Sequence, residues 1–326
     1  MASLAASAVA SPNIALLKYW GNHDAHLRLP ANDSLSFTLS GLETKTSVQF
    51  DTSLASDRLI LNGDIAGEES THRVAGVLDE VRRLSGLSDH ARVESENNFP
   101  IGAGIASSAS AYAALALAAS AAAGLKLEGK DLSRLARLGS GSAARSVFGG
   151  YVLLHAGLDH ESSFAEQLYP SSHWPLVDVI AIVEPGEKRV GSTGGHERAA
   201  SSPLQQARID DTNRRMRLVL HALEAKDFDR LAAVSELDSN MMHAVMLTSD
   251  PPLFYWTPTS LAIMQQVIDW RATGDPVFYT VDAGPNVHCI TLPDNASSLA
   301  DRLQQVSGVL RVLVAPIGNG ARLAPA

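Results

Sequence analysis

Cysteine is nearly absent from this 326-residue chain, in which Cys289 is the only one. A single cysteine excludes a disulfide within the chain and is typical of proteins from a reducing compartment, so we expect a cytoplasmic location. It also argues against a thiolate metal site, which needs several such ligands. Because Cys289 lies in the apolar, strand-like segment 287–292, a buried structural thiol is favoured over a nucleophile.

The chain also lacks an excess of positive charge. It has 26 Lys and Arg against 35 Asp and Glu, a net charge of −9. Nucleic-acid backbones require a basic surface, so we expect no nucleic-acid partner. A small anionic substrate is still compatible with this balance, because a local cluster of Lys and Arg can bind it inside an acidic protein.

Long Leu-, Ile- and Phe-rich runs are missing too. The longest run of small and apolar residues, 100–124, consists mainly of Ala and Ser and has no flanking Lys/Arg cluster, and the first 20 residues lack the basic segment of a signal peptide. We therefore expect no membrane partner.

What is present indicates a globular α+β protein of two domains. Hydrophobic residues make up 45% and charged residues 19% of the chain, which is ordinary for an enzyme. Alternating segments over 34–50 and an Asn62-Gly63 turn predict antiparallel strands, and the spacing over 71–84 and 204–225 predicts helices. We expect a polar loop over 185–203 and a frayed tail over 322–326. A break near 170–175 predicts domains 1–173 and 174–326.

Residues 100–124 form the most informative stretch. Pro100, Gly102 and Gly104 precede Ser107 and Ser108, and an Ala-rich segment then runs to a glycine. Small residues let a backbone approach a ligand closely, and the N-terminus of the following helix presents free N–H groups to an anion. The stretch predicts a phosphate cradle, although it is neither a Walker A loop nor a G-x-G-x-x-G motif. A core helix with a glycine-rich entry and no ligand is the equal alternative.

Three further clusters are candidates for chemistry. Residues 139–150 combine Ser140, Ser142 and Arg145, which suit an anion, or else form a flexible loop. The segment 18–24 offers polar groups for an oxyanion, or else a packed loop. Asp282 ends a predicted strand on a tight Ala-Gly-Pro turn, where it is a general base, a metal-bound carboxylate or merely a turn-forming residue.

Taken together, the motifs resemble the GHMP kinase superfamily, and within it the mevalonate diphosphate decarboxylase branch. They are Asn13-Ile14-Ala15, Lys18-Tyr19-Trp20-Gly21, Leu29-Pro30 with Ser34-Leu35-Ser36, residues 95–100 and 103–109, residues 139–143 with Arg145-Ser146 and 148–150, Asp238-Ser239-Asn240, Pro251-Pro252 and residues 282–286. The resemblance implies the GHMP kinase fold, with two α+β domains and the active site between them, and a homodimer.

The resemblance also implies an activity. In the family, ATP with Mg²⁺ phosphorylates the tertiary C3 hydroxyl of a 5-phosphorylated mevalonate, and the new phosphate then leaves together with CO2. Phosphorylation makes chemical sense here, because a tertiary hydroxyl is a poor leaving group and phosphate is a good one.

Site residues follow from the resemblance position by position. The catalytic pair is Asp282 and Lys18. Substrate-binding residues are Asn13, Tyr19, Trp20, Gly21, Asn22, Arg73, Ser140, Gly141, Ser142, Ala143, Arg145 and Thr193. ATP-binding residues are Ser95, Asn97, Pro100, Gly102, Gly104, Ala106, Ser107 and Ser108. The resemblance implies that Mg²⁺ rests mostly on ATP oxygens and water, with Ser107 or Ser108 as candidate protein ligands.

One departure from the family pattern bears on the substrate. Asn22 stands where diphosphate-using relatives carry a second lysine, and His196 and Leu138 are lesser departures. Losing a charge-assisted contact costs roughly 1.5–3 kcal/mol, and the longer tail should lose most. We therefore hypothesise a mevalonate 5-phosphate decarboxylase that makes isopentenyl phosphate. The alternative is an ordinary decarboxylase of mevalonate 5-diphosphate that tolerates Asn22.

Two alternative hypotheses assign the protein to other functional classes. A GHMP small-molecule kinase would phosphorylate without decarboxylating and would release ADP but no CO2. A catalytically silent binding member would bind ATP and turn nothing over. The presence of Asp282, Lys18, Ser107 and Arg145 together argues against the silent reading.

Overall fold

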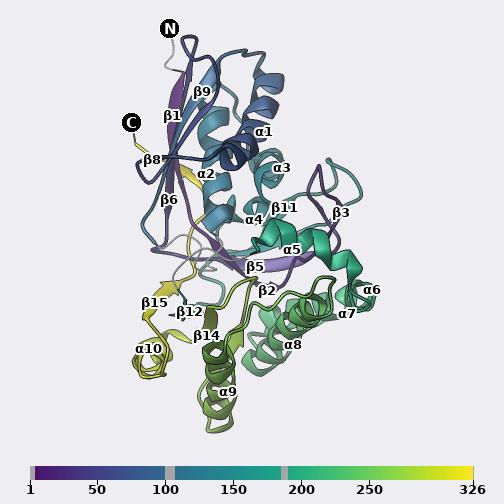
Figure 1. Cartoon of the computed structure of the whole chain (residues 1–326). Coiled ribbons are helices and arrows are strands. Elements are labelled where there is room, and N and C mark those ends of the chain that lie inside the picture. The colour runs from purple at the N-terminus through teal and green to yellow at the C-terminus, as the bar shows by residue number, and fades with distance from the viewer. Residues whose placement is uncertain (1–3, 100–106, 185–189, 326) are drawn as a thin grey trace.

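The computed structural model describes residues 4–99, 107–184 and 190–325. Figure 1 shows two layered halves, with the chain ends close to each other at one end of the molecule. Both halves combine sheets with helices, which confirms the predicted α+β class. No helix among the described residues is long and apolar enough to cross a membrane.

The first half is built on a six-stranded sheet covered by helices. The sheet has the order β16 (Arg322–Leu323), β1 (Ala5–Ala10), β6 (Thr44–Asp51), β9 (His90–Asn97), β7 (Arg58–Leu61) and β8 (Asp64–Ile65). The covering helices are α1 (Glu68–Ser85), α2 (Ser107–Ala122), α3 (Gly129–Gly139) and the short α4 (Ala143–Ser146). Helix α2 lies against β1 and β6 (Figure 1), and its many alanine residues allow this close packing.

Two four-stranded sheets meet in the middle of the molecule. One has the order β11 (Ala165–Tyr169), β10 (Tyr151–Leu154), β5 (Ser34–Thr38) and β2 (Asn13–Leu17), and the other has the order β13 (Val277–Thr280), β14 (Val287–Thr291), β12 (Val177–Ile182) and β15 (Arg311–Pro316). Ile14 and Phe37 of the first belong to the same buried cluster as Ile180 and Ile290 of the second. This shared apolar core fixes the end of β2 beside the end of β13.

Helices complete the second half. They are α5 (Ser192–Arg198), α6 (Gln205–Asp210), α7 (Thr212–Ala225), α8 (Phe228–Leu247), α9 (Pro258–Ala272) and α10 (Ala296–Gln304), with 3₁₀ turns η1 (Ala199–Ser201) and η2 (Pro293–Asn295). A ribbon of β3 (Asn22–Asp24) and β4 (Leu29–Pro30) projects beside α3.

The hairpin predicted at Asn62-Gly63 is confirmed. Leu61 pairs with Asp64, and the two turn residues have φ angles of 49° and 91°, as a type I′ turn requires. The predicted helix at 71–84 is also confirmed, as α1, and extends three residues further at its start.

Three local predictions were wrong. The expected loop 185–203 contains α5. Helix propensities do not predict it, because glycine disfavours helices and α5 contains Gly194 and Gly195. A Cβ atom on Gly195 would lie 2.5 Å from the Trp20 ring, so close packing requires glycine there. The expected helix 204–225 breaks at Asp211. The expected frayed tail instead pairs with β1 through Arg322 and Leu323.

Candidate active site

A cavity of about 450 Å³ lies where the two halves meet. Its described lining comes from both halves: Asn13, Ala15, Lys18, Tyr19, Trp20, Arg28, Arg73, Ser107, Ser108, Ser140, Gly141, Ser142, Arg145, Gly191, Ser192, Thr193, His196, Met242, Asp282 and Ala283. Four of these residues are basic, namely Lys18, Arg28, Arg73 and Arg145, and Asp282 is the only carboxylate among them. The cavity is therefore suited to an anionic ligand.

Lys18 and Asp282 form an ion pair across the two halves. Lys18 directly follows β2, and Asp282 lies in the turn between β13 and β14. Lys18 Nζ lies 2.5 Å from Asp282 Oδ1; the lysine is 2% exposed and the aspartate side chain 25% exposed. A carboxylate held beside an ammonium group and open to a cavity can accept a proton from a bound hydroxyl.

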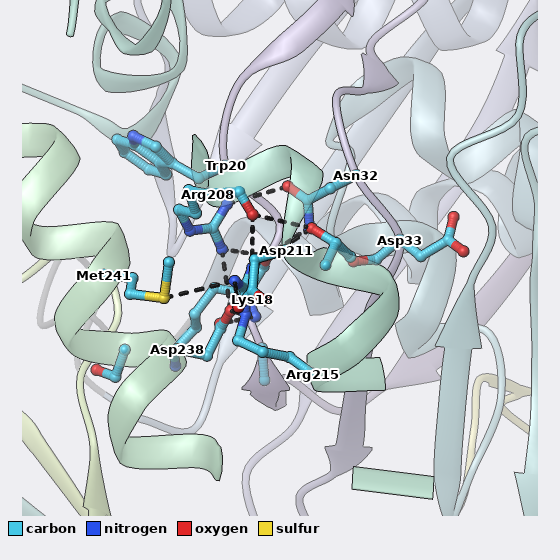
Figure 2. A network of polar contacts seen from close by, with 12 residues as sticks. Lys18, Trp20, Asn32, Asp33, Arg208, Asp211, Arg215, Asp238 and Met241 are labelled. Carbon is cyan, nitrogen blue, oxygen red and sulfur yellow. Dashed lines mark hydrogen bonds and ion pairs between the residues drawn. The ribbon is translucent and has the colours of Figure 1, made fainter. Parts of the chain in front are cut away.

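The main chain of Lys18 is held from both sides, as Figure 2 shows. Its N–H donates to Asp238 Oδ2 at 2.5 Å. Its carbonyl accepts from Arg208 Nη2 at 2.8 Å and from Asn32 Nδ2 at 2.9 Å. Because both the N–H and the carbonyl of Lys18 are hydrogen-bonded, side chains of α6 and α8 fix the position of its Cα atom, from which the side chain projects.

Asp238 in turn compensates two buried arginines. Its Oδ1 accepts from Arg215 Nε at 2.9 Å and lies 3.4 Å from Arg208 Nη2, and none of the three side chains is more than 1% exposed (Figure 2). The break between α6 and α7 serves this arrangement, because it frees the Arg208 carbonyl to accept from Arg215 Nη2 at 2.9 Å.

Arg145 lies buried in the cavity wall and binds only neutral groups among the described residues. Its guanidinium donates to Ser34 Oγ at 2.6 Å, Ser36 Oγ at 3.0 Å and Asn13 Oδ1 at 3.2 Å. Burial lowers the pKa of Arg145 to about 10, so it stays charged at neutral pH. A buried cation with neutral partners is a strong site for an anion.

Serine hydroxyls line the side of the cavity nearest α2. Ser107 and Ser108 open that helix, Ser108 Oγ lies 3.4 Å from Ser140 Oγ, and Ser140 Oγ lies 3.2 Å from Ser142 Oγ. Among the described residues, no group of three or more His, Cys, Asp or Glu could hold a metal. Hydroxyl donors of this kind suit a Mg²⁺ ion that is bound mainly through phosphate oxygens.

The structure brings most of the predicted substrate residues to the cavity. Those that line it are Asn13, Tyr19, Trp20, Arg73, Ser140, Gly141, Ser142, Arg145 and Thr193. Three lie beside it instead: Gly21 donates its N–H to His196 Nδ1 at 3.0 Å, Asn22 accepts the Tyr19 hydroxyl, and Ala143 is buried in α4.

The predicted nucleotide residues divide differently. Ser107 and Ser108 line the cavity, whereas Ser95 and Asn97 lie on β9, where they bond to Thr46 and Thr44 of β6. Pro100, Gly102, Gly104 and Ala106 lie outside the described residues.

Four residues at the site have roles that the sequence did not predict. Arg28 lines the cavity from the turn before β4, and Arg208 and Arg215 support Lys18 from behind. His196 was noted only as a departure, yet its ring stacks on Tyr19 with centroids 4.3 Å apart. The seven-residue spacing of Arg208 and Arg215 would place them on one face of the continuous helix expected over 204–225, but the structure puts them on two helices, α6 and α7.

His243 gives the protein a predictable acid sensitivity. It is 2% exposed, stacks on Trp256 and donates Nε2–H to the Val281 carbonyl at 3.2 Å, while burial lowers its pKa from 6.5 to about 3. Between these values the unfolded chain binds a proton that the folded chain does not, so the free energy of unfolding falls as pH falls. The contribution of His243 to this loss is about 2 kcal/mol between pH 7 and pH 5.

Urea unfolding at both pH values tests this expectation. His243→Gln keeps an N–H donor but cannot titrate. Between pH 7 and pH 5 the free energy of unfolding of this variant should therefore fall by about 2 kcal/mol less than that of the wild type. The same pH dependence in both proteins would contradict the assignment.

Comparison with known proteins agrees with this site. The model of the diphosphomevalonate decarboxylase-like N-terminal domain matches residues 10–165, and that of the mevalonate 5-diphosphate decarboxylase C-terminal domain matches residues 178–312. The diphosphomevalonate decarboxylase of Aspergillus fumigatus is 39% identical, over 93% of this chain and 80% of the relative.

Solved structures are similar along the whole chain. A structure described as MDDEF in complex with MVAPP, AMPPCP and magnesium has a TM-score of 0.93 and 41% identity, with 100% of both chains covered. The mevalonate diphosphate decarboxylase of Staphylococcus aureus has a TM-score of 0.93 and 36% identity over 98% of both chains. The predicted GHMP kinase fold is thereby confirmed, and the chain belongs to the diphosphomevalonate decarboxylase family.

Proposed function

We propose that this protein catalyses the ATP-dependent decarboxylation of mevalonate 5-diphosphate to isopentenyl diphosphate. The observation that carries the proposal is the Lys18–Asp282 pair, at 2.5 Å, in a cavity that also presents Arg28, Arg73 and Arg145. In this proposal Asp282 is the carboxylate that receives a proton, and the arginines hold a highly charged tail.

In this proposal Asp282 accepts the proton of the C3 hydroxyl. The C3 hydroxyl oxygen forms a bond to the terminal phosphorus of ATP, and the bond between that phosphorus and the ADP oxygen breaks. The C3–O bond then breaks. The electron pair of the bond between C2 and the carboxylate carbon becomes the second bond between C2 and C3. Phosphate and CO2 leave. Lys18 stabilises negative charge on the transferred group and keeps Asp282 oriented.

ATP and Mg²⁺ are assigned to the α2 side of the cavity. The Ser107 and Ser108 hydroxyls and the N-terminus of α2 supply donors there for phosphate oxygens. Magnesium supplies charge neutralisation on those oxygens when it is bound.

The preference for a diphosphate replaces the monophosphate hypothesis drawn from Asn22. The two family models and the relatives cited above are named for the diphosphate, so the monophosphate subgroup has no support from the comparisons. Asn22 still favours mevalonate 5-phosphate as a second candidate, because the side chain has no charge and bonds to Tyr19. Against it, Arg28 supplies a cation that the hypothesis did not count.

Steady-state release of ADP and CO2 with Mg·ATP, measured on both substrates side by side, tests the proposal. We expect kcat/KM to be at least tenfold higher for the diphosphate, because the longer tail gains about one more charge-assisted contact. Asn22→Lys should leave this order unchanged. A higher kcat/KM for the monophosphate would restore the first hypothesis, and ADP without CO2 would indicate a kinase.

A further inference from the structure

Arg28 has a backbone conformation that few non-glycine residues adopt. Its φ angle is 50°, in the left-handed region, and it lies in the turn that joins β3 to β4. Such residues cost stability and persist where the surrounding structure holds them, often at binding sites. Glycine would be the unstrained choice at this position, so the arginine side chain is the feature that needs explanation.

Two hydrogen bonds tie this turn to α3. Arg28 Nε donates to the Leu138 carbonyl at 3.0 Å, and Arg137, which is buried, donates through Nη1 to the Leu27 carbonyl. The bond through Nε fixes the plane of the Arg28 guanidinium. Arg28 is one of the residues that line the cavity.

Arg73 of α1 reaches the same place from another direction. Its Nη2 donates to the Gly139 carbonyl at 3.3 Å, one residue from the carbonyl that holds Arg28. The two guanidinium groups are therefore anchored side by side at the C-terminal end of α3. Their mutual repulsion is one of the effects, after burial, that lower the pKa of Arg28.

In the described part of the chain, no carboxylate pairs with the Arg28 or Arg73 guanidinium group to offset this repulsion. Neither Arg28 nor Arg73 forms an ion pair there, and Glu197 is the smallest of the charges that act on the pKa of Arg28. Arg73 Nε is buried and has no hydrogen-bond partner among the described groups. Two neighbouring cations with unused donors, facing a cavity, match a group that carries two negative charges.

We propose that Arg28 and Arg73 form the seat of the distal phosphoryl group of the substrate's tail, and that Arg28 takes over the part that a lysine at position 22 would have. This inference rests on the proposed function. Asn22 and Arg28 belong to the same β3–β4 ribbon, so the cation is supplied from the other end of one hairpin. Arg145 with Ser140 and Ser142 is left to hold the proximal phosphoryl group.

The test measures binding by calorimetry, without turnover, for mevalonate 5-diphosphate, mevalonate 5-phosphate and ADP. Arg28→Gly suits the left-handed backbone and removes the guanidinium, so the fold should be kept. It should weaken diphosphate binding by about 10- to 100-fold and monophosphate binding by less than about threefold. Arg28→Lys, which keeps the charge, should recover most of the loss, and ADP affinity should not change.

Arg83→Gln is the matched control. It removes an exposed arginine of α1 whose partner is Glu80, and it should leave all three affinities unchanged. If Arg28→Gly loses equal affinity for the diphosphate and the monophosphate, Arg28 contacts the proximal phosphoryl group or serves the fold. If only the affinity for ADP falls, Arg28 contacts the nucleotide. Either result overturns the proposal. So does unchanged diphosphate binding in Arg28→Gly. If the wild type binds no diphosphate at all, the proposed function itself fails, which is a different result.

Discussion

Asp282→Asn is expected to lower kcat by at least about a thousandfold, because general-base catalysis contributes 10²–10⁴-fold and Lys18 also loses its counter-ion. Asparagine has nearly the same shape and can still accept a hydrogen bond from Lys18, but it cannot take the proton of the C3 hydroxyl. Since Asp282 is the only carboxylate among the described residues that line the cavity, no neighbour there can replace it. The affinity for ADP should change little, because the proposed nucleotide donors lie on the α2 side.

Asp275→Asn is the matched control for this variant. Asp275 lies two residues before β13, whereas Asp282 lies two residues after it. Asp275 pairs with Arg302 at the surface. Exposed ion pairs contribute about 0–1 kcal/mol, so kcat should be unaffected and stability nearly so. If kcat of Asp282→Asn stays within about tenfold of the wild type while single-turnover phosphorylation is equally fast, Asp282 is not the base.

Asp238→Ala is expected to destabilise the protein by about 3–5 kcal/mol. The substitution would leave Arg208 and Arg215 buried without their shared carboxylate and would leave the Lys18 N–H without its acceptor. Because stabilities of whole proteins are only about 5–15 kcal/mol, this loss should be evident as a large drop in the urea midpoint. Asp238→Asn keeps the acceptor for Lys18 and should also be strongly destabilised, since the charge is lost.

The control on the same helix is Asp229→Asn. Asp229 lies in the exposed first turn of α8, where a negative charge is worth about 0.3–1 kcal/mol through the helix dipole. A loss below about 1 kcal/mol in Asp238→Ala, similar to that of the control, would show that the buried charges are compensated in another way.

The sequence predicted the parts of the site that carry chemistry in contiguous motifs. Lys18 and Asp282 are 264 positions apart, yet both stand in short motifs that resemble those of the family, and the structure brings their charged groups within 2.5 Å. Hydrophobic alternation and turn residues predicted strands such as β6 and the Asn62-Gly63 hairpin, since these depend on local geometry.

The rest could not be predicted because it depends on contacts between distant segments. The compensation of Arg208 and Arg215 by Asp238 arises only when α6, α7 and α8 pack together. Arg28 reaches the cavity because its turn is tied to the end of α3. Position 22 shows this limit, because the sequence reveals that a lysine is replaced by Asn22 but does not reveal that Arg28 brings a cation to the same cavity.

The most direct test of the account is to follow oxygen from the C3 hydroxyl. Mevalonate 5-diphosphate labelled with ¹⁸O at that hydroxyl is incubated with the protein and Mg·ATP, and ADP, CO2 and inorganic phosphate are quantified together. We expect equal amounts of the three, with the label in the inorganic phosphate, because the C3–O bond breaks after the oxygen has joined phosphorus. ADP without CO2, or phosphate without the label, would contradict decarboxylation through a C3 phosphate.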